Sequence, residues 1–119
     1  MVSKQYWGQL TSIDLYGCDH QKISHNKTIK NFPLHLCKEI DMEPHGRPLI
    51  KIFGKGTLRG HSLMQFIKTS SITAHFDEVK NRAFIDIFSC RLFDKKTAIK
   101  FCKDFFSAKR FKSKTIYRG

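Results

Sequence analysis

The sequence lacks the features that would place it outside the ordinary globular proteins. It contains three prolines and seven glycines in 119 residues, with no internal repeat and no low-complexity segment. Charged residues interrupt its apolar stretches every few positions, and no stretch approaches the roughly 20 apolar residues that span a bilayer. A single domain covering residues 1–119, without a membrane segment, is therefore the expected organisation.

The sequence also lacks a cysteine framework. The four cysteines form neither Cys-x-x-Cys pairs nor the dense framework of a secreted, disulfide-linked domain, so we expect reduced thiols. Cys18, His20 and His25 would supply three metal ligands, but a structural zinc site needs a fourth, and we predict no metal. Residues 1–10 contain no apolar segment ending in a small-residue cleavage site, so a cytoplasmic location is the expectation.

Acidic residues are few compared with basic ones. Ten Asp and Glu stand against 22 Lys and Arg, giving a net charge of +12, and such a surface can attract nucleic acid, anionic lipid or acidic partners. However, the basic residues are spread along the chain. The densest segment, residues 95–118, is partly an amphipathic helix whose polar face must carry charge. The commoner explanation for these basic residues is a helix face exposed to solvent, so we do not expect nucleic acid as a partner.

Hydrophobic patterning predicts two kinds of element. Alternation and β-branched residues indicate six strands, at residues 5–15, 48–53, 62–67, 71–76, 83–90 and 110–117. Apolar positions every three to four residues between Ile29 and Ile40 indicate a helix, which we expect to begin near Pro33. Asp94 is a natural N-cap for a second helix that ends near Phe106. This order predicts an α+β fold, a two-layer sandwich with two helices on one face of a largely antiparallel sheet.

Three adjacent hydroxyl residues, Thr69, Ser70 and Ser71, stand where two extended runs meet without a Gly or Pro to form a hairpin turn. A bulge or strand end whose hydroxyls bond the backbone would explain them. Another explanation is chemical, because a sheet could bring His75, Ser62 and Cys90 to the same place. Each of these residues alone is typical of a structural role, but together they supply a nucleophile, a base and a proton donor.

Two motifs resemble a known family. Residues 60–75 read GHSLMQFIKTSSITAH and residues 85–90 read IDIFSC. They resemble the prokaryotic S-adenosylmethionine decarboxylase family, in which a Glu-Ser-His-Ile-Ser-Ile-His segment precedes a Val-Asp-Val-Phe-Thr-Cys-like strand. Residues 15–19, LYGCD, also resemble the end of that family's first strand, so the resemblance extends over nearly the whole chain.

The resemblance implies a pyruvoyl-dependent, self-cleaving zymogen. Ser70 falls on the serine that becomes the pyruvoyl group after autocatalytic cleavage between Thr69 and Ser70. Ser62 and His75 fall on residues that assist this processing, and Cys90 falls on the cysteine that donates a proton during turnover. The pyruvoyl ketone would form a Schiff base with the substrate's amine and accept the electrons released as carbon dioxide departs.

The resemblance also implies the biological setting. The lyase would convert S-adenosyl-L-methionine into the aminopropyl donor for spermidine, in polyamine biosynthesis. Cleavage would leave chains of residues 1–69 and 70–119, and a homodimer of such cleaved protomers, with active sites drawing on both, is the expected assembly.

The chain departs from the family pattern near the cleaved bond. Thr69 replaces a glutamate and Ser71 replaces a histidine. The family's Trp-Pro-Glu is replaced within residues 76–79, FDEV; the resemblance associates that glutamate with the substrate's ribose, and Asp77 or Glu78 would substitute at a shifted register. Two alternatives therefore stay open. One is pyruvoyl-dependent decarboxylation of arginine or ornithine, and the other is an unprocessed, non-enzymatic homologue that binds nucleic acid.

Overall fold

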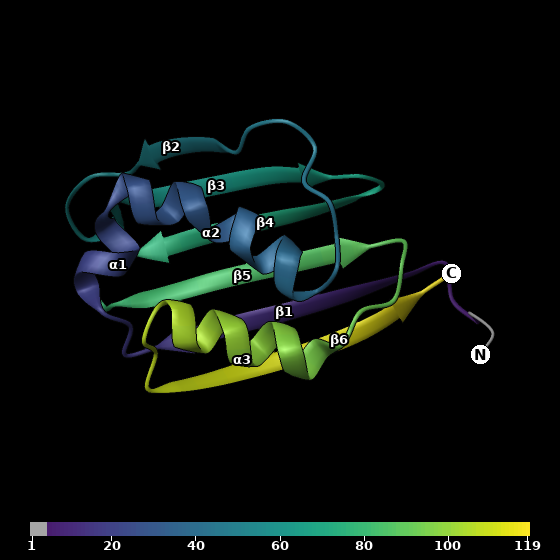
Figure 1. Ribbon diagram of the computed structural model, residues 1–119. Helices are drawn as coiled ribbons and strands as arrows, with labels where there is room; N and C mark the ends of the chain where they lie inside the picture. Colours follow the sequence, from purple (N-terminus) through teal and green to yellow (C-terminus); the bar gives the residue numbers. More distant parts are fainter. Residues whose placement is uncertain (1–4) are drawn as a thin grey trace.

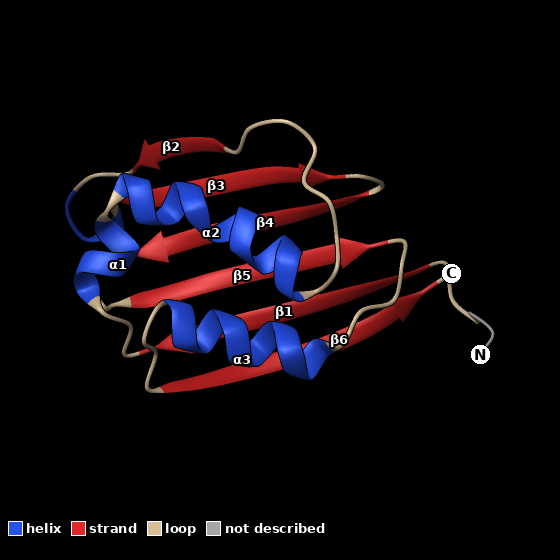
Figure 2. Ribbon diagram, viewed as in Figure 1, coloured by secondary structure: helices blue, strands red, loops and turns tan. Residues whose placement is uncertain are grey.

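A computed structural model describes residues 5–119, in which a six-stranded sheet carries its helices on one face (Figures 1 and 2). The elements in chain order are β1 (Gly8–Tyr16), α1 (His20–Ser24), α2 (Asn26–Glu39), β2 (Leu49–Phe53), the 3₁₀ turn η1 (Gly56–Leu58), β3 (Gly60–Ile67), β4 (Ser70–Asp77), β5 (Arg82–Ser89), α3 (Lys95–Phe105) and β6 (Arg110–Arg118). All neighbouring strands are antiparallel, in the order β2-β3-β4-β5-β1-β6. The predicted α+β sandwich is confirmed. None of the helices in this part of the chain is long and apolar enough to cross a membrane.

The sheet forms because its strands alternate between apolar residues that face the helices and more polar residues that face away. In β5, Ala83, Ile85 and Ile87 are fully buried, whereas Phe84 and Asp86 between them are not. The same period-two pattern runs through β3 and β4. The alternation sets which side chains each face presents, and so where each candidate site residue points.

The helices differ from the prediction in two ways. α2 begins at Asn26, well before Pro33, and contains that proline in its interior. Pro33 cannot donate a backbone hydrogen bond, but burial of Ile29, Phe32 and Leu36 on one face offsets this loss. α1 is a third helix that was not predicted. Its five residues are too few to show a periodicity, and it begins where Asp19 accepts a hydrogen bond from the Gln21 backbone N–H.

β3 and β4 form a hairpin, although their connection contains neither Gly nor Pro. The register pairs Ile67 with Ser70, so Lys68 and Thr69 alone make the turn. Thr69 reaches the required conformation with φ of 66°, in the left-handed region. The turn was not anticipated because a β-branched residue rarely adopts that conformation.

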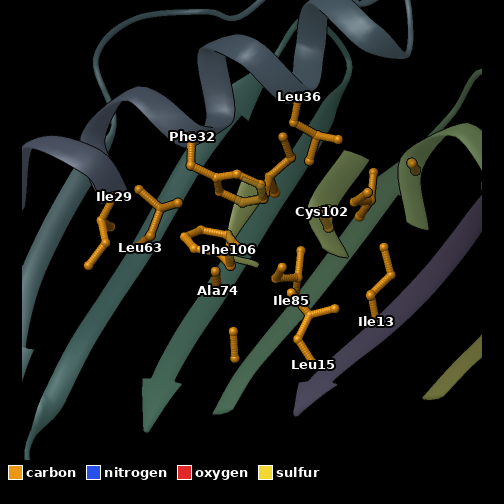
Figure 3. Packing of buried hydrophobic residues seen from close by; sticks show 14 of the residues in the cluster. Ile13, Leu15, Ile29, Phe32, Leu36, Leu63, Ala74, Ile85, Cys102 and Phe106 are labelled. Carbon is orange, nitrogen blue, oxygen red and sulfur yellow. The ribbon is translucent and has the colours of Figure 1, made fainter. Parts of the chain in front are cut away.

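The core lies between the sheet and the helices, and aromatic rings join its parts. The Phe32 ring of α2 lies 4.8 Å, centroid to centroid, from the ring of Phe106, the C-cap residue of α3. Phe106 in turn lies 5.2 Å from Phe76 of β4. Figure 3 shows the Phe32 and Phe106 rings next to each other, with Leu63 of β3 and Ile85 of β5 also in this cluster. One continuous core therefore attaches both long helices to the central strands.

The helices lie on one face of the sheet only, and we call the opposite side the open face (Figure 1). Strand register gives its composition. One row across the sheet runs through Phe66, Ser71, Phe88, Leu10 and Ile116. A parallel row nearer the other end of β4 runs through Ser62, His75, Phe84, Asp14 and Lys112. The open face therefore carries an apolar row at one end and a polar, titratable row at the other.

The core predicts a large cost for removing its central ring. Phe32→Ala should lower the free energy of unfolding by about 3–5 kcal/mol, because it deletes a fully buried side chain and leaves a cavity among three phenylalanines. Urea unfolding followed by circular dichroism measures the change. Leu34→Ala in the same helix is the matched control: Leu34 is 42 % exposed, so the change should stay within about 0.5 kcal/mol. Equal effects of the two substitutions would contradict the packing described here.

Candidate active site

The turn between β3 and β4 gives Thr69 and Ser70 unusual surroundings. Thr69 has positive φ, which costs a β-branched residue on the order of 1–3 kcal/mol. Ser70 begins β4 directly after it, with its side chain on the same side of the strand as the buried Ile72. The peptide bond between a strained residue and a serine therefore lies at the tip of the hairpin.

The Ser70 hydroxyl is anchored by a second serine. Ser70 Oγ donates a 3.0 Å hydrogen bond to Ser89 Oγ on β5, and strand register places the two residues directly opposite each other. Ser89 is fully buried, and its Oγ also accepts a 3.0 Å hydrogen bond from the Arg91 backbone N–H. Sequence reasoning missed Ser89; the signal was a hydroxyl residue in the apolar strand that ends at Cys90.

Cys90 completes this group of residues at the tip of the hairpin. It follows β5 directly, and its Sγ lies 2.8 Å from Thr69 Oγ1. All four cysteines are free thiols, and Cys90 is half-buried whereas the other three are buried. Burial raises the pKa of Cys18 and of Cys37 to about 11 and raises that of Cys102 further. Cys90 is thus the thiol best placed for chemistry. We call Thr69, Ser70, Ser89 and Cys90 the turn cluster.

Ser62 and His75 form a separate pair on the open face. They lie opposite each other in the β3–β4 ladder, and Ser62 Oγ is 2.9 Å from His75 Nδ1. Asp86 lies on the next strand of the same face. Its pKa is raised by burial and by the negative charge of Asp14, and His75 partly opposes that rise. Asp86 was not singled out from the sequence.

One chain does not bring the turn cluster and the Ser62–His75 pair together. Ser70 and His75 are five residues apart on one extended strand, which is about 16 Å. Side chains alternate between the two faces along a strand, so two residues five positions apart point to opposite faces. Ser70 therefore lies on the helix side of β4 and His75 on the open face. The four residues expected to meet within the sheet therefore form two groups at different ends of the hairpin.

The two carboxylates suggested for substrate binding both have basic partners. Asp77 Oδ2 accepts hydrogen bonds from Arg82 Nη2 and Nε at 2.6 and 2.8 Å. Burial alone would raise the pKa of Asp77, but the hydrogen bonds and charge of Arg82 outweigh it and lower that pKa. Glu78 lies 3.0 Å from Arg59 Nη1 and 3.3 Å from Nδ1 of the buried His61.

A surface hollow lies next to each group. The first is lined by the turn cluster residues Thr69, Ser70 and Ser89, together with Lys68 and Arg91. The second lies beside the Ser62–His75 pair and is lined by His75, Asp77, Arg82 and Phe84. Residues 5–119 contain no group of three His, Cys, Asp or Glu side chains close enough to hold a metal ion.

Comparison with known proteins gives consistent similarities. The family model for S-adenosylmethionine decarboxylase matches residues 9–119. The S-adenosylmethionine decarboxylase proenzymes of Clostridium botulinum strains Langeland and Hall are each 28% identical to this chain over 116 residues, covering 97% of both sequences. The crystal structure of the adenosylmethionine decarboxylase from Aquifex aeolicus VF5 superposes with a TM-score of 0.81 at 19% identity, covering 98% of this chain and 93% of that one.

The Asp77–Arg82 ion pair predicts a pH-dependent contribution to stability. Because folding lowers the pKa of Asp77, the ionised carboxylate stabilises the fold above its unfolded pKa, and that contribution is lost as pH falls through the folded pKa. Asp77→Asn should therefore cost up to about 1 kcal/mol at pH 6.5, and the cost should shrink as the pH falls below the unfolded pKa of about 3.9 and through the lower folded pKa. Urea unfolding at several pH values measures the difference. Arg82→Gln should reproduce the same pattern, and a cost that is constant with pH would exclude an ionic contribution.

Proposed function

Because the chain belongs to the S-adenosylmethionine decarboxylase family, we propose that it is a proenzyme that cleaves itself between Thr69 and Ser70 and decarboxylates S-adenosylmethionine. Cleavage would give chains of residues 1–69 and 70–119, with a pyruvoyl group at the start of the second. The observation that carries the proposal is the family match across residues 9–119, together with a serine directly after the strained residue of the hairpin.

The residues of the turn cluster fit formation of a pyruvoyl group. In the first step Ser70 Oγ attacks the carbonyl carbon of Thr69; the C–N bond breaks and an ester forms. Loss of the Ser70 α-proton then expels the Thr69 carboxylate and leaves dehydroalanine, which water converts to the ketone with release of ammonia. Before the reaction, Ser70 Oγ donates a hydrogen bond to Ser89 Oγ, with 3.0 Å between the two oxygens. Once formed, a pyruvoyl group supplies an electron sink for decarboxylation.

His75 is the base that we assign to the α-proton, with Ser62 as its hydrogen-bond partner. Within one chain that base is about 16 Å from Ser70 along the strand. A homodimer resolves this separation. In a two-fold symmetric dimer every contact occurs twice, because each protomer uses the same surface against the other. Stacking the open faces about an axis near the middle of the hairpin would place the Ser62–His75 pair of one protomer against the open-face side of its partner's hairpin turn. The Ser70 hydroxyl points to the helix side there, so the base would approach the Ser70 backbone, which carries the α-proton, from the opposite side.

The exposed apolar side chains of the open face support such a dimer. Phe66 is 61 % exposed and Met64 53 % exposed, and Trp7, also 61 % exposed, stacks on Phe88 at 5.9 Å between ring centroids. Large exposed apolar patches are typical of protein–protein contacts. Covering the open face would remove this surface from water and complete two active sites with the same contact.

Cys90 is the residue that we assign to proton return after carbon dioxide departs. It is half-buried and next to the bond to be cleaved, and its thiol can donate a proton to the α-carbon. Asp77 remains the better placed of the two proposed substrate carboxylates, because it lines the hollow beside His75 with Phe84. Glu78 accepts a hydrogen bond from Arg59 instead, at 3.0 Å. A carboxylate with an arginine partner is a weaker anchor for ribose, which keeps arginine and ornithine as alternative substrates.

Ser70→Ala should abolish both chain cleavage and decarboxylation, because alanine has no hydroxyl to attack the Thr69 carbonyl. Intact mass detects the fragments, and release of carbon dioxide from S-adenosylmethionine, arginine or ornithine identifies the substrate. Ser71→Ala is the matched control and should still be cleaved, since it leaves in place the Ser70 hydroxyl that attacks the Thr69 carbonyl. An uncut wild-type chain would support the non-enzymatic alternative, and a cut, active Ser70→Ala protein would refute the role of Ser70.

Mixing two inactive variants tests the shared active site. Neither Ser70→Ala nor His75→Ala should be cleaved efficiently alone. In a mixed dimer, however, one site combines Ser70 of the His75→Ala chain with His75 of the Ser70→Ala chain. With equal expression about half of the dimers are mixed, so about half of the His75→Ala chains should be cut. Distinct affinity tags and intact mass identify which chain is cleaved. Purified mixed dimers that stay uncut would rule out sharing between protomers, as would normal cleavage of His75→Ala alone.

A further inference from the structure

Two loops line the hollow beside Ser70. Residues 40–48 connect α2 to β2, and residues 90–94 connect β5 to α3. We call them the α2–β2 loop and the β5–α3 loop. The first contributes residues 41–43 to the hollow and the second contributes Arg91. Each loop is bound to the sheet through the side chain of a buried glutamine.

Gln65 of β3 binds the α2–β2 loop. Gln65 is 1 % exposed, and its Nε2 lies 2.8, 3.1 and 3.3 Å from the carbonyl oxygens of Phe66, Gly46 and His45, respectively. Carbonyl oxygens only accept hydrogen bonds, so the amide nitrogen must occupy this position and the amide oxygen cannot. Two of the three carbonyls belong to the loop. The partners of Gln65 therefore fix the direction of the contact.

The α2–β2 loop in turn binds the hairpin turn. The backbone N–H of Lys68 donates a 3.1 Å hydrogen bond to the Glu43 carbonyl oxygen. Beside this bond, Pro44 forms an isolated β-bridge with Ile67. Lys68 directly precedes Thr69, whose carbonyl carbon is the proposed site of attack. An anchored loop therefore restricts the positions that this carbonyl can take.

Gln9 of β1 binds the β5–α3 loop. It is as buried as Gln65, and its Oε1 accepts a 3.0 Å hydrogen bond from the Phe93 backbone N–H. A backbone N–H only donates, so this direction is fixed as well. The same loop supplies the Arg91 backbone N–H that donates to Ser89 Oγ. The oxygen that binds the Ser70 hydroxyl is thus connected to an anchored loop.

The position of Gln65 in β3 indicates that its amide serves more than packing. It lies between Leu63 and Ile67 on the helix side of the strand, where both neighbours are apolar and buried. Its Oε1 is buried without a hydrogen-bond partner within residues 5–119. Burying an unpaired polar atom costs stability. Stability alone would therefore favour an apolar side chain here, and the contacts of Nε2 with the loop provide a reason for glutamine.

We propose that Gln65 and Gln9 are positioning residues for self-cleavage. Gln65 acts through the α2–β2 loop on the Thr69 carbonyl, and Gln9 acts through the β5–α3 loop on the Ser70 hydroxyl. Attack requires the oxygen and the carbonyl carbon to meet within a narrow range of distances and angles, so loosening either loop lowers the rate. The inference rests on the proposed function, because it concerns the bond that would be cleaved.

Hydrogen exchange followed by NMR tests the anchoring in uncut protein. In a Ser70→Ala background, Gln65→Met and Gln9→Met each remove an amide and keep a side chain of similar length. Gln65→Met should raise exchange of the Lys68 backbone N–H about fivefold, the worth of one ordinary hydrogen bond, and leave the Phe93 N–H unchanged. Gln9→Met should do the reverse, so each variant is the control for the other.

The pattern of exchange distinguishes anchoring from general stability. A rise spread over all strands, or the same pattern in both variants, would overturn the inference, because a merely structural glutamine affects the whole fold. Unchanged exchange at Lys68 in Gln65→Met would overturn it as well. If a methionine variant does not fold, leucine at the same position also lacks the amide and is measured in its place.

The rate of cleavage tests the consequence. With Ser70 intact, Gln65→Met and Gln9→Met should each be cleaved about fivefold more slowly than wild type after cell-free synthesis. Intact mass follows cleavage, at a temperature where circular dichroism shows that each variant is folded. Ile29→Val is the control for stability, because it removes a buried methyl group in the first half of α2. It should be cleaved at the wild-type rate. Wild-type rates in both methionine variants, or an equally slow Ile29→Val, would overturn the inference.

Hydroxylamine, which cleaves esters, separates positioning from proton transfer. Poorly positioned groups slow formation of the ester, so the uncut Gln65→Met chain should resist hydroxylamine. Loss of the base has the opposite effect, since the ester would accumulate in His75→Ala and be cut at Ser70. A Gln65→Met chain that hydroxylamine cuts would refute the positioning role.

The two proposals fail in different ways. A wild-type chain that is never cut counts against the proposed function, whatever the exchange rates are. Unchanged exchange in the Ser70→Ala background counts against the anchoring, even if the wild-type chain is cut and active.

Discussion

The antiparallel register of β3, β4 and β5 determines where every candidate site residue lies. One pairing places Ser62 opposite His75, and another places Ser70 opposite Ser89. Shifting β4 by one residue would break both pairs and turn Ile72 and Ala74 out of the core. The register is therefore set by burial, and the arrangement of the site depends on it.

That register also separates two functions of the hairpin in space. The turn end offers the peptide bond, the serine and the thiol, whereas the opposite end offers the imidazole and the polar row of the open face. An extended strand cannot fold back on itself, so no side-chain movement within β4 closes a gap of about 16 Å. Under the proposed function a second chain would supply the missing partner, and the apolar row on the open face is a surface suited to receive one. Assembly and chemistry would then be linked through one face of the sheet.

Sequence patterning predicted the elements whose signals are local. Alternation identified the strands, and Asp94 marked the start of α3, where it accepts hydrogen bonds from the Lys96 and Thr97 backbone N–H groups. The start of α2 was misjudged because Pro33 is a strong local signal that tertiary burial overrides. The two groups of site residues were not separated either. Motif spacing gives positions along the chain, but the face that a side chain occupies depends on strand parity and pairing.

Three separate requirements apply at position 69, and they explain why a residue other than threonine would not easily satisfy all of them. The turn requires positive φ, which glycine would satisfy best. The proposed cleavage would require only a backbone carbonyl, which any residue provides. The hydrogen bond from Cys90 requires an oxygen acceptor on the side chain, which glycine lacks. Threonine provides that oxygen 2.8 Å from the Cys90 sulfur, at the cost of a strained backbone.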